Sequence, residues 1–191
     1  MAEQLVSQLH GPMYRAAAVN RVYTGVVGTA GIALIVAATT GNHPTLWNPS
    51  SSKRNVSILR LEVSWISGNN APGAIYWHHT PNTGDALAVP ILTFTQVAPV
   101  GIVGGALDNK ARWAPAVSTY TAVPGFLRPT GLSLFTGVAA TAVAPFILEK
   151  RYDGDFIVAP GNAVHLCTQA ATTTALLAIA VVWEEIDIVS T

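Results

Sequence analysis

The chain has 191 residues, of which 50% are hydrophobic and only 10% are charged, and its ten basic and ten acidic side chains cancel. This length suits one domain, or one domain with an arm. The balanced charge argues against a nucleic-acid partner, because phosphate recognition needs clustered Lys and Arg. The single cysteine, Cys167, excludes an internal disulfide and a cysteine-based zinc site, and we expect a buried, inert thiol.

The apolar residues are mostly Ala, Val and Ile, and they come in short runs that Gly and Pro interrupt. This pattern predicts an all-β chain with more apolar surface than its own core needs. Burial against further copies or a larger partner would explain the surplus. No nucleotide loop, metal cluster or catalytic constellation stands out. We therefore expect a structural protein, not an enzyme, with no metal and no cofactor.

Three long uncharged stretches, 24–41, 86–107 and 129–148, raise the question of a membrane. A spanning helix needs about 20 predominantly apolar residues. These stretches are rich in Gly and Thr, and prolines interrupt the second and third, so strand pairs separated by turns explain them better. We expect no membrane partner and no signal peptide; a membrane-inserting protein built on 24–41 is the third alternative.

Residues 1–21 differ from the rest and are predicted to form an N-terminal arm, with the β domain spanning 22–191. Two helical turns over 2–9 would end at Gly11-Pro12. The apolar side chains of the arm are predicted to hold a partner or a neighbouring copy; they are Leu5, Val6, Leu9, Met13 and Tyr14. The alternative makes this segment the first strand of the domain.

The remaining chain predicts an antiparallel β-sandwich of about eight to ten strands. The clearest strand is 56–66, where Leu59, Leu61 and Val63 alternate with Arg60 and Glu62. The other candidates are 22–27, 32–40, 74–79, 91–97, 116–122, 132–143, 146–150, 163–168 and 175–188. Residues 108–112 form a polar patch that is expected to be an exposed loop.

The last predicted strand is apolar at every position from 176 to 183. A strand that is wet on one face should alternate, so we expect both of its faces to be covered. The second cover would be a helix, a long loop or a neighbouring subunit. For a neighbouring subunit, the predicted interface residues are Leu176, Ile179 and Val181. This predicts a homo-oligomer, and we expect a trimer.

Two local patterns carry a resemblance. Leu46-Trp47-Asn48-Pro49 precedes a Ser-rich basic loop and the strand 56–66, and an apolar strand, the turn at Pro160-Gly161 and a second apolar strand precede Trp183-Glu184-Glu185. Together they resemble small virion structural proteins of tailed bacteriophages with jelly-roll-like sandwich domains, above all head decoration, or cement, proteins. The resemblance implies symmetric self-association, often as trimers, on the capsid surface, with the major capsid protein as partner. The resemblance implies no catalytic residues.

The polar residues suggest little chemistry of their own. His78 and His79 are adjacent on a predicted strand and point to opposite faces, so they cannot easily chelate one ion. The same argument separates Glu184 from Glu185 and disfavours paired acid–base catalysis; we expect a solvated strand end. The acidic turn at 153–155 is expected to be a plain turn beside basic neighbours.

These observations predict a virion structural protein, a capsid decoration protein that self-associates and clamps neighbouring capsid subunits on the capsid surface. The alternative is a phage tail or receptor-binding protein on the same sandwich. In that alternative, exposed aromatic side chains such as Tyr76, Trp77 or Trp113 would stack on a glycan.

Overall fold

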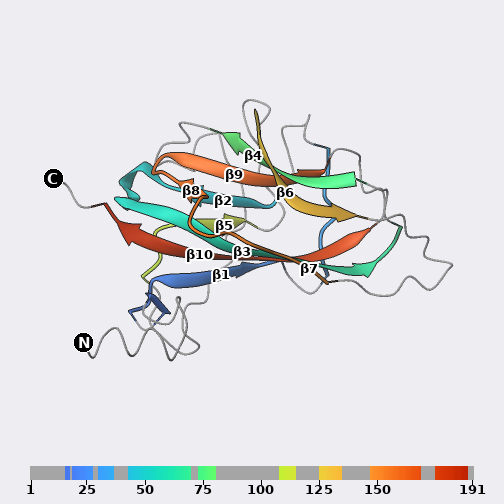
Figure 1. Cartoon of the computed structure of the whole chain (residues 1–191), viewed down its shortest axis with the longest axis horizontal. Coiled ribbons are helices and arrows are strands. Elements are labelled where there is room, and N and C mark those ends of the chain that lie inside the picture. Colours follow the sequence, from blue (N-terminus) through green and yellow to red (C-terminus); the bar gives the residue numbers. More distant parts are fainter. Residues whose placement is uncertain are drawn as a thin grey trace.

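The computed structural model describes residues 16–17, 19–27, 30–36, 43–69, 73–80, 108–114, 125–134, 147–168 and 175–188. They form ten strands in two antiparallel sheets, stacked as two layers (Figure 1). The prediction of an all-β sandwich is confirmed. The first sheet has the order β1 (Val22–Val26), β10 (Leu176–Asp187), β3 (Arg54–Ser67) and β7 (Ile147–Arg151), and β8 (Ile157–Val158) also pairs with β3. The second sheet has the order β5 (Arg112–Ala114), β2 (Thr45–Asn48), β9 (Asn162–Thr168), β4 (Gly73–Thr80) and β6 (Gly125–Leu134).

The strand pairing is nested. β1 pairs with β10, β2 with β9, β3 with β7 and β4 with β6, all antiparallel. This is one long hairpin of eight strands, and rolling it into two sheets brings β10 beside β3 and β9 beside β4. Two four-stranded sheets with this order are a jelly roll. The short strands β5 and β8 add to its margins.

The space between the sheets is filled by side chains that alternate inward from both layers. Trp77, Trp113 and Trp183 are fully buried there, and aliphatic residues such as Leu61 and Leu166 pack around them. Burial of this kind is the main stabilising contribution to the fold. The Trp77 Nε1–H group donates to the Tyr152 hydroxyl at 2.8 Å, so this polar atom is satisfied inside the core.

Strand β10 has one buried face and one partly exposed face, so the described residues do not supply the second cover that the sequence predicts. Its odd-numbered residues from 177 to 183 point into the core and are buried, whereas Leu176, Ala178 and Ala180 lie on the outer face and stay partly exposed. The strand therefore alternates, and small alanines at the outer positions hide the alternation in the sequence. Burial on both faces occurs instead in the second sheet, where every residue of β2 and all but the first residue of β9 are buried.

The other predicted strands match to different degrees. The predicted strands at 22–27, 56–66, 74–79, 146–150, 163–168 and 175–188 correspond to β1, β3, β4, β7, β9 and β10. Residues 32–36 form only isolated bridges at Ile32 and Val36. The strand predicted at 132–143 begins earlier, at Gly125, and the polar patch at 108–112 ends in β5 with Ala111 fully buried. Residues 91–97 and 116–122 lie outside the described residues.

Candidate interaction surface

The outer face of the first sheet has an apolar half built by β1 and β10. Register places Val26 beside Ala180 and Thr24 beside Val182, with Ala178 further along β10. Val26 is 43% exposed although it is apolar. Small side chains on a sheet leave a flat surface that another protein can approach closely.

The predicted interface residues divide between this face and the core. Leu176 lies on the outer face and is partly exposed. Ile179 and Val181 point the other way and are fully buried in the core of their own domain. Their position corrects the assignment of these two residues to an interface, since neighbouring positions on a strand face opposite sides. Leu5, Val6, Leu9, Met13 and Tyr14 lie outside the described residues.

The other half of this face, built by β3 and β7, carries charges. Arg60 lies opposite Arg151, and Glu62 lies opposite Glu149. Like charges directly across a sheet repel, and ion pairs along each strand offset this repulsion. The Arg60 Nε atom lies 2.9 Å from Glu62 Oε1, and Arg151 Nε–H donates to Glu149 Oε1. This hydrogen bond lowers the pKa of Glu149 and raises the pKa of Arg151.

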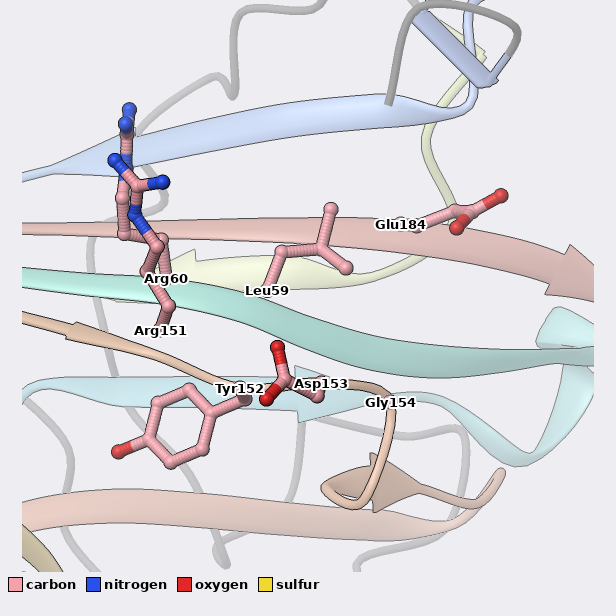
Figure 2. A pocket seen from close by; sticks show the side chains of 7 residues that line it. All are labelled: Leu59, Arg60, Arg151, Tyr152, Asp153, Gly154 and Glu184. Atoms are coloured by element: carbon pink, nitrogen blue, oxygen red, sulfur yellow. The ribbon is translucent and has the colours of Figure 1, made fainter. Parts of the chain in front are cut away.

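A hollow of about 470 Å³ opens beside the two arginines (Figure 2). A β-bulge forms it: Val182 pairs with Arg60 and Trp183 with Ile58, so Leu59 is an extra residue on β3. The lining residues are Leu59, Arg60, Arg151, Tyr152, Asp153, Gly154 and Glu184. The turn after β7 closes one side, where Gly154 adopts a φ of 83° that favours glycine.

The hollow has a basic and an acidic part. Figure 2 shows the two guanidinium groups on one side of Leu59 and the carboxylate of Glu184 on the other, with Asp153 at the turn. Burial raises the pKa of Glu184, and Arg21 opposes that shift. The Tyr152 hydroxyl belongs to the core, because it accepts the hydrogen bond from Trp77, and burial raises the pKa of Tyr152.

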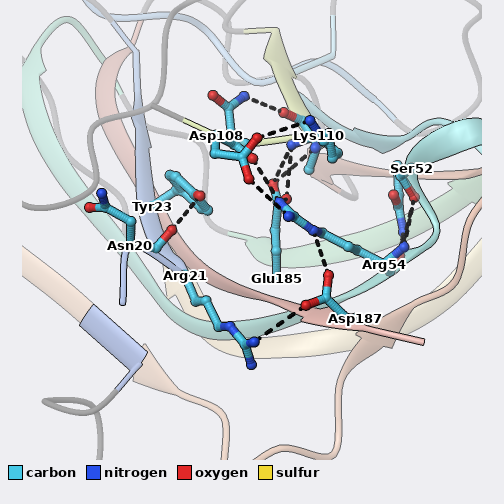
Figure 3. A network of polar contacts seen from close by, with 12 residues as sticks. Asn20, Arg21, Tyr23, Ser52, Arg54, Asp108, Lys110, Glu185 and Asp187 are labelled. Atoms are coloured by element: carbon cyan, nitrogen blue, oxygen red, sulfur yellow. Dashed lines mark hydrogen bonds and ion pairs between the residues drawn. The ribbon is translucent and has the colours of Figure 1, made fainter. Parts of the chain in front are cut away.

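A second polar group lies at the end of the first sheet, around Glu185 (Figure 3). The Glu185 carboxylate is 1% exposed and accepts hydrogen bonds from the backbone N–H groups of Lys110 and Ala111 and from Arg54. Arg54 also donates to Asp108 and Asp187. The expectation of a solvated strand end is therefore wrong for Glu185. This network fastens 108–111 to β3 and β10.

The charges of this network stabilise one another. Burial opposes the charge of Arg54, but hydrogen bonds to Asp108, Asp187 and Glu185 outweigh it and raise the pKa of Arg54. Hydrogen bonds from Lys110 and Arg54 lower the pKa of Asp108. These mutual hydrogen bonds give the network the properties of a structural ion cluster.

A histidine–cysteine group lies on the outer face of the second sheet. His43 Nδ1 is 3.1 Å from Cys167 Sγ, and His165 lies between Thr45 Oγ1 at 3.0 Å and Thr80 Oγ1 at 2.9 Å. His43, His165 and Cys167 are fully buried. Burial raises the pKa of Cys167 to about 12 and lowers the pKa of His165 well below its usual value. A neutral thiol without solvent access is a poor nucleophile, so this group favours structure over catalysis.

The adjacent histidines and the tryptophans that the sequence suggested as ligand-binding residues do not form a site. His78 packs edge-on against the Phe126 ring, whereas His79 Nε2 lies 2.9 Å from Asn162 Oδ1, so the two imidazoles do not converge. Within the described residues, no group of three His, Cys, Asp or Glu side chains is arranged to hold a metal ion. Trp77 and Trp113 are fully buried, which corrects the expectation that they stack on a glycan.

Apolar groups are also exposed around the start of β6. Phe126 is 63% exposed and Leu127 is 41% exposed, and Ile157 on β8 is 54% exposed. Leu127 and Ile157 line a smaller hollow of about 230 Å³ together with Phe156. This margin of the sandwich is a second place where apolar surface is left uncovered by the described residues.

Comparison of the chain with protein-family models, curated proteins and solved structures finds no match. None of the helical residues that the structure describes belongs to a helix long and apolar enough to cross a membrane.

Proposed function

We propose that this chain is a virion structural protein, a capsid decoration protein that self-associates and clamps neighbouring capsid subunits. The observation that carries the proposal is the nested strand pairing of a jelly roll around a filled core. Jelly rolls occur in viral capsid domains, lectins and cupins. A cupin-like site would need room between the sheets, where Trp77, Trp113 and Trp183 are packed. This packing favours the outer surfaces as the places where the domain acts.

Self-association is supported by the outer face of the first sheet. Leu176, Ala178 and Ala180 are partly exposed on β10, and Val26 lies beside them on β1. The scarcity of charge in the chain favours burial of such a face against a copy. Soluble homo-oligomers close with point-group symmetry, and we propose a trimer.

Sedimentation velocity at micromolar concentration tests self-association. We expect a particle three times the 20.0 kDa mass of the chain. Ala180→Arg places a large charge on the apolar half and should give monomers with an unchanged circular dichroism spectrum. The matched control is Ala159→Arg, at an exposed position in the loop between β8 and β9, and it should leave the trimer intact. A wild-type protein that stays monomeric would contradict the proposal.

Electron microscopy tests the capsid role. The purified protein is mixed with capsids of the virus whose genome encodes the chain, prepared without it. We expect regularly spaced extra density on the capsid surface, and less release of packaged nucleic acid on heating. Bare capsids after saturation with a properly folded protein would count against a decoration role.

A second function, receptor or glycan binding, is favoured by the hollow beside Arg60 and Arg151. A tail protein that binds a glycan would show that function without coating capsids. A glycan-binding screen beside the microscopy separates the two proposals: bare capsids together with glycan binding favour the second function, and coated capsids favour decoration.

A further inference from the structure

We propose that the hollow lined by Leu59, Arg60, Arg151, Asp153 and Glu184 binds an acidic sugar, whose carboxylate lies between the two arginines. The inference does not depend on capsid binding, because a decoration protein and a tail protein can each carry such a site. It rests on three features of the hollow: the arginine pair, the carboxylates with the apolar floor, and the size.

The two arginines form an incomplete pair of donors. Arg60 and Arg151 are directly opposite in register, so their Cβ atoms lie about 5 Å apart. Each guanidinium approaches the glutamate of its own strand through Nε. Among the described residues, neither arginine has a further partner at its Nη atoms. Guanidinium forks match a carboxylate in geometry and charge, so one carboxylate can receive hydrogen bonds from both side chains.

The rest of the hollow suits a hydroxyl-bearing ring. The carboxylates of Asp153 and Glu184 accept hydrogen bonds, which sugar hydroxyls donate. Leu59 offers an apolar surface between them and the arginines, where the apolar face of a pyranose can lie (Figure 2). A Cβ atom at Gly154 would meet no atom within 4 Å, so the turn leaves open space. The volume of about 470 Å³ is in the usual range of about 300–1,000 Å³ for small-ligand sites.

The same charges disfavour other anionic ligands. An acidic peptide would bring a second carboxylate towards Asp153 and Glu184, and like charges repel. Phosphate or acetate can engage the arginines but has no hydroxyl-bearing ring for the remaining acceptors. Since Glu62 and Glu149 already balance the arginines, recognition depends on hydrogen-bond geometry more than on a net positive field.

Nuclear magnetic resonance titration of the full chain tests the site. The ligands are glucuronate and N-acetylneuraminate as acidic sugars, glucose as the neutral sugar, and acetate and inorganic phosphate as anions without a sugar ring. We expect backbone shifts at Leu59 and Gly154 with an acidic sugar, and at least tenfold weaker binding of glucose, acetate and phosphate. Equal binding of acetate and glucuronate would overturn the sugar assignment, and an absence of shifts with every acidic sugar would overturn the site.

Variants identify the residues. Arg60→Gln and Arg151→Gln each remove a charged donor, and we expect about tenfold weaker binding of the acidic sugar from either change. The matched control is Arg128→Gln, because the side chain of Arg128 is 35% exposed, close to the 33% of Arg60, and is also paired with a carboxylate. The control should bind as the wild type does. Unchanged binding in both arginine variants, or the same loss in the control, would overturn the proposal. Neither result would alter the sedimentation or microscopy outcomes.

Discussion

The carboxylate of Glu185 is nearly inaccessible, and its partners come from two distant segments of the chain. We expect Glu185→Gln to lower the free energy of unfolding by about 3–5 kcal/mol, because it removes the buried negative charge beside Arg54 and turns one acceptor oxygen into a donor that faces the N–H groups of 110–111. Urea denaturation measures the change. Glu62→Gln is the control: it removes a partly exposed ion pair with Arg60, and it should cost at most about 1 kcal/mol. Equal effects of the two variants would contradict the structural role of Glu185.

His165 predicts a dependence of stability on pH. Burial lowers its pKa in the folded protein, so the unfolded chain takes up a proton near pH 6.5 while the folded chain does not. The stability that the neutral ring contributes is present above pH 6.5 and is lost as the pH falls, by up to about 1.4 kcal/mol per pH unit. Denaturation at pH 7, 6 and 5 measures this loss. His165→Gln should depend less on pH, and an identical slope in that variant would contradict the assignment.

For single residues, the sequence predicts which face of a strand a side chain occupies better than it predicts whether that side chain is buried. Strand geometry alone separates Glu184 from Glu185, and the structure agrees. Which of the two is buried could not be foreseen, because the donors that satisfy Glu185 lie on residues 110 and 111. The hollow could not be predicted for the same reason. The sequence places Arg60 on the outer face, but strand register sets its neighbour Arg151 and the bulge at Leu59.

Strand β1 passes directly over the core, and Gly25 is the residue that allows it. A Cβ atom at this position would overlap the side chain of Trp113. Because Trp113 is fully buried and cannot move aside, we expect Gly25→Ala to destabilise the protein by about 1–3 kcal/mol. Thermal unfolding measures it. Gly73→Ala is the control, since nothing lies within 4 Å of its added Cβ atom; a larger loss at Gly73 than at Gly25 would contradict this packing.

Among the elements, long alternating strands were predictable and short or interrupted ones were not. The period-2 pattern at 56–66 lies within β3, and the apolar run near the end of the chain gives β10. β2 has only four residues, too few for a pattern. β6 contains Pro129, which the middle of a sheet rarely tolerates; β6 is at the margin of the second sheet, where a missing N–H group costs little.

At the scale of the whole molecule, deletion within the N-terminal arm tests whether this segment holds a partner or a neighbouring copy. The described residues before β1 are joined to the domain, since Arg21 accepts a hydrogen bond from Glu185 N and pairs with Asp187. Deleting residues 1–15 keeps these contacts. We expect an unchanged thermal midpoint and a loss of trimers or of capsid binding, measured by calorimetry, sedimentation and microscopy. An insoluble or unfolded truncated protein would assign the arm to the core.

The place of β10 between β1 and β3 has a consequence for biosynthesis. Val22 pairs with Glu184, so the first sheet closes only after almost the whole described chain has left the ribosome. Chains dominated by such non-local pairs fold slowly. At translation rates of about 5–20 residues per second, β1 and β3 wait several seconds or longer without their central partner. Nascent chains that stop before Leu176 leave the β10-facing edges of β1 and β3 unpaired, and unpaired strand edges make such chains prone to aggregation until β10 is made.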